Sequence, residues 1–259
     1  MCLILFAFEA HPQYRLIVAA NRDEFYRRPT AALNFWQDDP TILAGRDLEA
    51  GGTWLGITRK GRWAAVTNYR DPRRIIYDPL SRGTLVHTFL SGQEGPEPFL
   101  RRLQNRSYRY NGFNLLVGDG AAFFHFSSQG NGIQRLQPGI YGLSNRLLDS
   151  PWPKLLQGKR RLKALMAEKE HIEPADLLPI LTDRTIAEDH RLPDTGIGIE
   201  KERMLSPAFI ASPDYGTRSS SVLTISSKGV VQFTEYTWPT DGSGTDPVAV
   251  QTHQFTIGK

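Results

Sequence analysis

Two apolar runs of strand length open the chain and constrain its fold more than any other feature. Residues 2–9 and 14–20 are rich in Leu, Ile, Val and Phe, and residues 10–13 between them include Pro12. Runs this short, separated by turn residues, indicate buried strands. We therefore expect a central pair of strands, with the polar residues 22–29 forming a loop after the second one.

The rest of the chain reads as hairpins interrupted by two groups of helices. Three turn pairs, Lys60-Gly61, Asp119-Gly120 and Lys228-Gly229, each separate two apolar segments, which is typical of β-hairpins. Further strands are expected over residues 139–143 and 248–257. Helical periodicity indicates helices over residues 81–90, with Ser81 as N-cap, 99–103, 152–168, with Ser150 and Pro151 at its start, and 174–181. Many hairpins with few helices predict an α+β fold of antiparallel sheets covered by helices.

Helix 152–168 is expected to bury Trp152, Leu155 and Leu156 and to expose Lys154. Residues 182–213 are expected to form a long surface connection, and residues 241–246 a flexible loop.

Composition limits the functional classes. The 259 residues are 40% hydrophobic and 22% charged, with a net charge of +4, so we expect one soluble domain over residues 1–259. Both signs of charge are scattered, which gives no reason to expect a nucleic-acid partner. No stretch is long and apolar enough for a membrane span, and we expect a cytoplasmic protein. The sequence does not specify the oligomeric state.

The only cysteine is the second residue. Removal of Met1 would leave Cys2 with a free amine beside its thiol, and the two groups ordinarily have pKa values of about 7.7–8.0 and about 8.5. The amine would then accept the thiol proton, so that one residue supplies both nucleophile and base. With Met1 attached, the amine is blocked. A lone cysteine is also common as a small buried hydrophobic residue.

A single cysteine excludes an internal disulfide, and the six histidines show no metal-ligand spacing, so no metal is expected.

Polar residues gather at the ends of predicted strands. Together they include the types of side chain that an acyl-transfer site requires. Asn side chains supply donors for an oxyanion, and Arg and Asp tune charge and orient a base. Each residue alone is equally typical of a turn or a solvated charge. The group consists of Asn21, Arg22, Asp23, Glu24, Asn68, Arg70, Asn145, Arg146 and Arg218.

Eight short motifs in order resemble the NRDE proteins, also called the transport and Golgi organisation 2 family. The segment Asn21-Arg22-Asp23-Glu24 is the signature of that family, and the likeness covers about 220 residues. Besides Met1-Cys2 and this signature, the matching pieces are Ala44–Asp47, Gly51–Gly56, Val66–Arg70, Ser81–Gly83, Gly142–Asn145 and Gly216–Ser219.

The order of these residues also resembles, more distantly, the choloylglycine and penicillin V acylases, which are N-terminal-nucleophile hydrolases with a four-layer αββα sandwich. The resemblance implies that Cys2 is the nucleophile and that Arg22 and Asp23 lie beside it. It further implies oxyanion donors at Asn68 and Asn145 and a charge-balancing role for Arg218.

The chain departs from the acylase pattern at the arginine and the aspartate. Two residues separate them in the acylases, whereas Arg22 and Asp23 are adjacent here, and neighbours on a strand point to opposite faces. Three explanations stay open: the loop bends, Glu24 takes the acidic role, or the site is degraded.

The resemblance implies a hydrolase that cleaves a linear, non-peptide amide bond of a small molecule and requires no cofactor. The alternative that it also implies is binding or mobilisation of a hydrophobic ligand, either haem or a lipid or acyl-CoA, without turnover. A third interpretation is an organising protein with a vestigial site. Trp54 is interpreted either as a pocket residue or as a core aromatic. The residues expected to bind substrate are Asn21, Glu24, Trp54, Tyr69 and Arg70.

Overall fold

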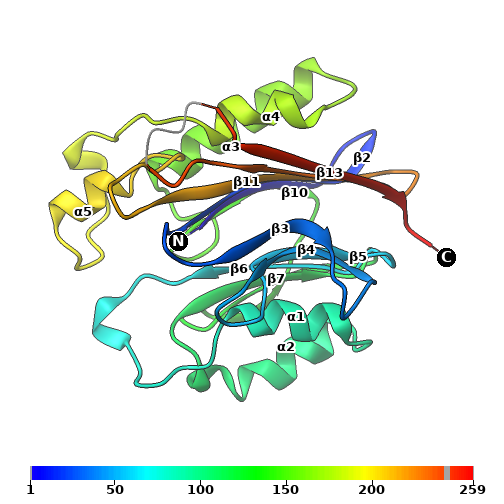
Figure 1. The fold of residues 1–259 in the computed structure, drawn as a ribbon, viewed down its shortest axis with the longest axis horizontal. Helices are drawn as coiled ribbons and strands as arrows, with labels where there is room; N and C mark the ends of the chain where they lie inside the picture. Colours follow the sequence, from blue (N-terminus) through cyan, green and yellow to red (C-terminus); the bar gives the residue numbers. More distant parts are fainter. Residues whose placement is uncertain (1, 242–245, 259) are drawn as a thin grey trace. The chain divides into compact units, whose positions relative to one another are not determined.

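The computed structural model describes residues 2–241 and 246–258, so Met1 and residues 242–245 of the predicted loop lie outside the described residues. The chain divides into two compact units (Figure 1). The first unit consists of Met1–Arg27, Pro138–Ser144 and Leu148–Gln254, and the second consists of Arg28–Gln137, Asn145–Leu147 and Phe255–Lys259. The single domain expected over residues 1–259 stays a prediction.

The first unit is built on a six-stranded sheet in the order β10-β1-β2-β11-β12-β13. Neighbours from β10 to β12 pair antiparallel. The two apolar runs that open the chain form the adjacent strands β1 and β2, as predicted. The strands are β1 (Cys2–His11), β2 (Tyr14–Phe25), β10 (Gly139–Leu143), β11 (Tyr215–Ser226), β12 (Val230–Thr237) and β13 (Ala249–Thr256).

Two helices, α3 (Pro153–Glu168) and α4 (Pro174–Leu181), pack on one face of this sheet (Figure 1). Leu3 and Leu5 of β1 share a buried cluster with Leu155 of α3 and Leu177 of α4. Because side chains alternate along a strand, Cys2 leaves the face of the sheet that is opposite to this helix-covered face. A short helix, α5 (Ile199–Met204), and a 3-10 turn, η3 (Asp189–Arg191), lie in the segment between α4 and β11.

The second unit is built on a seven-stranded antiparallel sheet whose strands follow one another in chain order, β3 to β9. Helix α1 (Gly83–Ser91) packs on β5 and β6, and α2 (Pro96–Gln104) packs on β8 and β9. Two 3-10 turns, η1 (Pro72–Arg74) and η2 (Ser107–Arg109), complete it. The strands are β3 (Thr30–Phe35), β4 (Ile42–Asp47), β5 (Leu55–Thr58), β6 (Trp63–Asn68), β7 (Phe113–Gly118), β8 (Phe123–Ser127) and β9 (Gly132–Arg135). The predicted α+β class, with antiparallel sheets covered by helices, is confirmed.

The predicted loop over residues 22–29 is wrong in its first half. Strand β2 continues to Phe25, because β11 pairs with it through Tyr215, which lies opposite Phe25. The predicted surface connection over residues 182–213 is also not entirely irregular, because it contains α5 and η3. These segments are short and polar, and their sequences lack a clear helical period.

Four details of the helices also differ from the prediction. Arg82, rather than Ser81, is the N-cap of α1, and α3 begins at Pro153 after Trp152 rather than at Ser150 and Pro151. Lys154 is buried, because its Nζ donates a hydrogen bond to the Leu205 carbonyl at 2.8 Å. Leu156, expected in the core, is 50% exposed.

Gly52 is required by a close approach of two backbones in the second unit. A Cβ atom at this position would lie 2.5 Å from the carbonyl carbon of Gly83 and 2.9 Å from the amide nitrogen of Thr84. Both obstacles are backbone atoms at the start of α1, so rotation of a side chain does not relieve the clash.

We therefore predict that Gly52→Ala lowers the free energy of unfolding by at least about 1–3 kcal/mol, the usual cost of overpacking. Urea denaturation at pH 7 measures this change. Gly258→Ala is the matched control, because nothing lies within 4 Å of a Cβ at Gly258. Equal midpoints for the two variants would contradict the prediction.

Candidate active site

Strand register places Cys2 directly opposite Arg22. The two residues are Cα partners in the β1–β2 pair, and Arg22 is in turn the partner of Ser219 on β11. Directly opposed residues have Cα atoms about 4.5–5.5 Å apart and project their side chains from the same face. The thiol and a buried guanidinium therefore leave the sheet side by side, on the face opposite the helices.

Arg218 enters the same neighbourhood through a β-bulge. The register of β11 against β2 shifts between Thr217 and Ser219, which makes Arg218 the extra residue. Its guanidinium donates a hydrogen bond to the Phe25 carbonyl at 3.0 Å. Burial lowers the pKa of Arg218 and the charge of Arg22 lowers it further, whereas Glu24 raises it. Two arginines thus lie close together beside the start of β1.

Arg22 and Asp23 point to opposite faces, because β2 does not bend between them. Asp23 is buried on the helix-covered face, and the hydroxyl of its strand partner Thr217 donates a hydrogen bond to its Oδ1 at 2.8 Å. Burial raises the pKa of Asp23, and the Lys154 ammonium and the Thr217 hydrogen bond act against this rise. The buried carboxylate is therefore costly to ionise, and two partners reduce that cost.

Glu24 lies on the same face of β2 as Arg22, and its Oε1 accepts a hydrogen bond from the Phe25 amide at 2.8 Å. The Asp23 carboxylate nevertheless acts on the thiol. Burial raises the pKa of Cys2 and the charge of Asp23 raises it further, while Arg22 and a hydrogen bond from the Asp23 backbone lower it. The Asp23 charge thus raises the pKa of the thiol, although the Asp23 side chain lies on the opposite face of the sheet.

Two residues next to this group were not predicted as site residues. The hydroxyl of Ser144, which is fully buried, donates a hydrogen bond to the Cys2 carbonyl at 3.0 Å and holds the start of β1. Thr217 holds Asp23. Both lie inside motifs that carry the family resemblance, Gly142–Asn145 and Gly216–Ser219, and that position is the only sequence signal for them.

The second unit brings together another set of predicted residues. The Asn145 side chain donates a hydrogen bond to the Asn68 carbonyl at 2.9 Å, and the Asn145 carbonyl accepts one from the Arg70 amide at 2.8 Å. The Arg146 guanidinium lies over the ring of Tyr69, 5.1 Å from its centre. The end of β6 and the segment that follows β10 in sequence are therefore joined within this unit.

Two residues predicted to bind substrate are packed inside their units. Asn21 is fully buried on the helix-covered face, where its amide donates to the Leu181 and Ala208 carbonyls, both at 2.8 Å, and its oxygen accepts from Ser220. Asn21 therefore joins the end of α4 to the sheet. Trp54 is 9% exposed, in the loop before β5, which favours its interpretation as a core aromatic.

The fold class follows from this architecture. Antiparallel sheets with helices packed on one face, and a cysteine at the start of a central strand, define an α+β fold like that of the N-terminal-nucleophile hydrolases, as predicted. A solved variant of conjugated bile acid hydrolase from Clostridium perfringens has the same fold, with a TM-score of 0.51 and 11% sequence identity over 99% of this chain and 98% of that chain.

Residues 1–240 match the family model described as Transport and Golgi organisation 2. The Transport and Golgi organization protein 2 homolog of Bos taurus is 37% identical to this chain and covers 99% of both chains. The protein of the same name from Homo sapiens is 36% identical over 91% of this chain and 92% of its own length. The chain belongs to this family.

In the part of the chain that the structure describes, no three His, Cys, Asp or Glu side chains are grouped closely enough to hold a metal ion. Of the helices within residues 2–241 and 246–258, none has the length and apolar character to cross a membrane.

The Thr217 hydroxyl has two buried partners, because it donates to Asp23 and accepts from the Ile210 amide at 2.9 Å. We predict that Thr217→Val lowers the free energy of unfolding by about 1–3 kcal/mol, since both partners lose their hydrogen bond. Thr217→Ser, which keeps the hydroxyl, should lose much less. Chemical denaturation of both variants checks this, and an equal loss would assign the effect to packing.

The raised pKa of the thiol predicts a shifted pH profile for alkylation of the chain that retains Met1. Only the thiolate reacts with iodoacetamide, so the rate in the folded protein should reach half its maximum at a higher pH than in the same protein unfolded in urea. Mass spectrometry of the alkylated chain gives both profiles. Simple steric protection would slow the reaction at every pH and leave the midpoint unchanged.

Proposed function

We propose that this protein is a cysteine amidohydrolase of the N-terminal-nucleophile type, which cleaves a linear, non-peptide amide bond of a small molecule. The observation that carries the proposal is the strand register that sets Cys2 beside Arg22, with Arg218 brought next to Arg22 by the bulge. The proposal requires removal of Met1, so that the α-amine of Cys2 is free. No cofactor takes part.

In the first half of the reaction, the Cys2 sulfur attacks the amide carbonyl carbon and the thiol proton passes to the α-amine. The carbonyl oxygen becomes an oxyanion. As the intermediate collapses, the carbon–nitrogen bond breaks and the ammonium returns the proton to the leaving amine. Cys2 is left as a thioester with the acyl group.

In the second half, the α-amine takes a proton from a water molecule, which attacks the thioester carbonyl. The carbon–sulfur bond breaks, the carboxylic acid leaves, and the sulfur recovers its proton from the ammonium. The chain that retains Met1 has no free amine on Cys2, and burial keeps its thiol protonated at neutral pH. Removal of Met1 would supply the base beside the thiol.

The charged residues have separate roles in this scheme. Arg22 opposes the rise in the pKa of the thiol and stabilises the thiolate on its own face of the sheet. Asp23 positions the α-amine, and Thr217 orients the Asp23 carboxylate. Arg218 helps to stabilise the negative charge that develops on the sulfur beside Arg22. Asn68 and Asn145 are the oxyanion donors that the family resemblance assigns, with Glu24, Tyr69 and Arg70 as its substrate-binding residues.

The relatives support the class of reaction in one respect. The structural neighbour with the same fold is named a bile acid hydrolase, and its name describes a hydrolysis of conjugated bile acids. The substrate of the present chain is proposed only as an N-acyl compound, in which a carboxylic acid is joined to an amine.

Native protein purified under mild conditions tests the proposal. Intact mass shows whether Met1 has been removed, and a panel of N-acyl amines and N-acyl amino acids is then screened for acid release. Cys2→Ala should lower the rate at least about a thousandfold, because loss of a nucleophile removes the covalent route. Brief incubation of the wild-type protein should add one acyl group to its mass.

The matched control is Arg135→Gln, which replaces an exposed residue of β9 and should leave the rate unchanged. A Cys2→Ala protein with full activity would refute the proposal, as would a native protein that retains Met1 and yet turns over the same substrates.

A further inference from the structure

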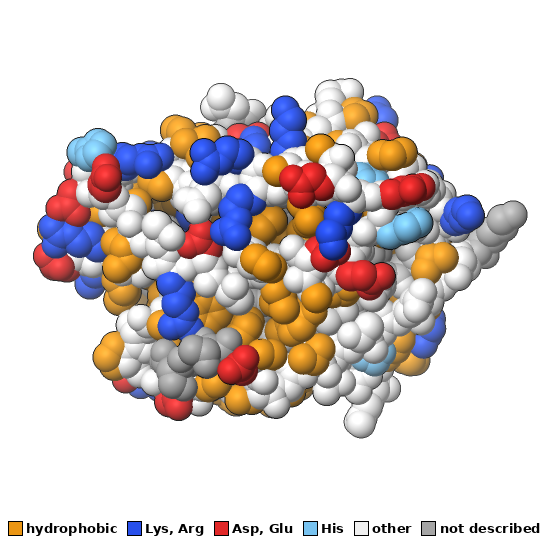
Figure 2. All heavy atoms as spheres, turned by 90° about the horizontal axis from the view of Figure 1, so that it is seen from above, with side chains coloured by type: hydrophobic (Ala, Val, Ile, Leu, Met, Phe, Trp, Pro, Cys, Tyr) orange, Lys and Arg blue, Asp and Glu red, His pale blue; other side chains and the backbone are white. Residues whose placement is uncertain are grey.

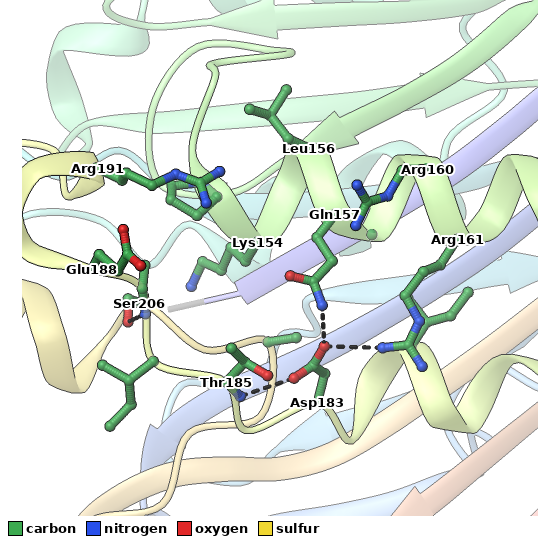
Figure 3. A pocket seen from close by; sticks show the side chains of 16 residues that line it. Lys154, Leu156, Gln157, Arg160, Arg161, Asp183, Thr185, Glu188, Arg191 and Ser206 are labelled. Carbon is green, nitrogen blue, oxygen red and sulfur yellow. Dashed lines mark hydrogen bonds and ion pairs between the residues drawn. The ribbon is translucent and has the colours of Figure 1, made fainter.

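A pocket of about 510 Å³ lies on the helix-covered side of the first unit, away from the face that bears Cys2. Its walls come from α3, from the segment that follows α4, from η3 and from residues 206–208 (Figure 3). This volume falls within the range of small-molecule sites, about 300–1,000 Å³. None of the reaction steps proposed above uses it.

The pocket carries more basic than acidic side chains. Four basic residues line it, Lys154, Arg160, Arg161 and Arg191, against two acidic ones, Asp183 and Glu188. Figure 2, which looks onto the face bearing α3 and α4, shows Lys and Arg side chains spread across it among apolar and acidic side chains. The pocket therefore favours an anion over a cation or a neutral molecule.

Part of the basic charge already has internal partners. Arg161 forms an ion pair with Asp183 at 2.9 Å, and the Gln157 amide donates to the same carboxylate at 2.6 Å. The Lys154 ammonium donates to the Leu205 carbonyl at 2.8 Å. These contacts build the wall of the pocket.

Arg160 and Arg191 are different. Neither guanidinium forms an ion pair or a side-chain hydrogen bond with any residue in the described ranges 2–241 and 246–258. Figure 3 shows their side chains extending towards one another from opposite sides of the pocket, one from α3 and one from η3. A guanidinium presents donors in a planar fork that matches a carboxylate or a phosphate group. Two such forks aimed into one pocket form an anion clamp.

The pocket also has apolar walls that reach solvent. Leu156 and Ile186 both line it, and they are 50% and 62% exposed. Leu156 is the residue that helical periodicity assigned to the core. Exposure of large apolar side chains costs free energy unless a partner covers them, and the apolar body of a ligand would do so.

We propose that this pocket binds a small amphipathic anion, in which Arg160 and Arg191 hold a carboxylate or phosphate group while Leu156 and Ile186 cover a hydrocarbon part. Carboxylate and phosphate share the chemistry that the clamp recognises, so both are tested. The inference does not depend on Cys2 and stands or falls independently of the hydrolase proposal.

Isothermal titration calorimetry of the full chain with octanoate and with octyl phosphate tests the site, and the tighter arm identifies the head group. Inorganic phosphate and octanol are the charge-only and apolar-only probes. We expect both amphipathic anions to bind more tightly than either partial probe. Leu156→Asn should weaken octyl phosphate and leave inorganic phosphate unchanged.

The double variant Arg160→Gln, Arg191→Gln should weaken both anions at least roughly tenfold, the loss expected when charge-assisted hydrogen bonds are removed. Lys163→Gln, Arg135→Gln is the matched control, because it removes two exposed positive charges outside the pocket, one of them on α3. It should change the affinity by less than about twofold. Circular dichroism and thermal melting verify that all variants fold.

Three results would overturn the proposal. The first is no binding of either anion to the wild-type protein at millimolar concentration. The second is an equal loss in the control, which would assign the effect to net charge. The third is octanol binding as tight as octanoate binding with no effect of the double variant, because the pocket would then recognise only hydrocarbon.

Discussion

The pairing of β1, β2 and β11 is the constraint on which the candidate site depends. It is made by backbone hydrogen bonds between two consecutive strands, β1 and β2, and the distant strand β11, and it fixes which side chains share a face. Through it Cys2 meets Arg22 on one side of the sheet, while Asp23 meets Thr217 on the other. A slip of one residue in this pairing would exchange the two sets and separate the thiol from its guanidinium.

The strands and hairpins with clear patterns could be predicted from the sequence, whereas segments defined by their partners could not. Helix α4 occupies residues 174–181 as expected, and the Lys60-Gly61 turn joins β5 to β6. The extension of β2 to Phe25 was missed because its residues are polar, and they are strand only because β11 pairs with them. Lys154 was assigned to the exposed side of α3, since periodicity does not reveal carbonyl groups supplied by the distant residues 205 and 207.

The candidate site was predictable as a list of residues but not as an arrangement. The adjacency of Arg22 and Asp23 left three explanations open. In the structure, both residues lie within strand β2, and each face of this strand carries one buried charged side chain. Lys154 and Thr217 compensate the Asp23 charge locally, and on the other face the Arg22 charge lowers the pKa of the neighbouring thiol. Such compensation depends on contacts between distant segments, and residue identity alone does not give it. The same holds for the pairing of Asn145 with Asn68 in the second unit.

The bulge at Arg218 has a consequence for how the chain tolerates changes in length. Thr217 and Ser219 are two positions apart, yet they face opposite sides, because the extra residue absorbs one step of the alternation. Deletion of position 218 would therefore leave both neighbours with their present partners, whereas a deletion elsewhere in β11 would invert every residue beyond it. A single-residue gap at this point keeps the alternation of faces along β11, but it removes the carbonyl that accepts a hydrogen bond from the Trp238 amide and the guanidinium that lies next to Arg22.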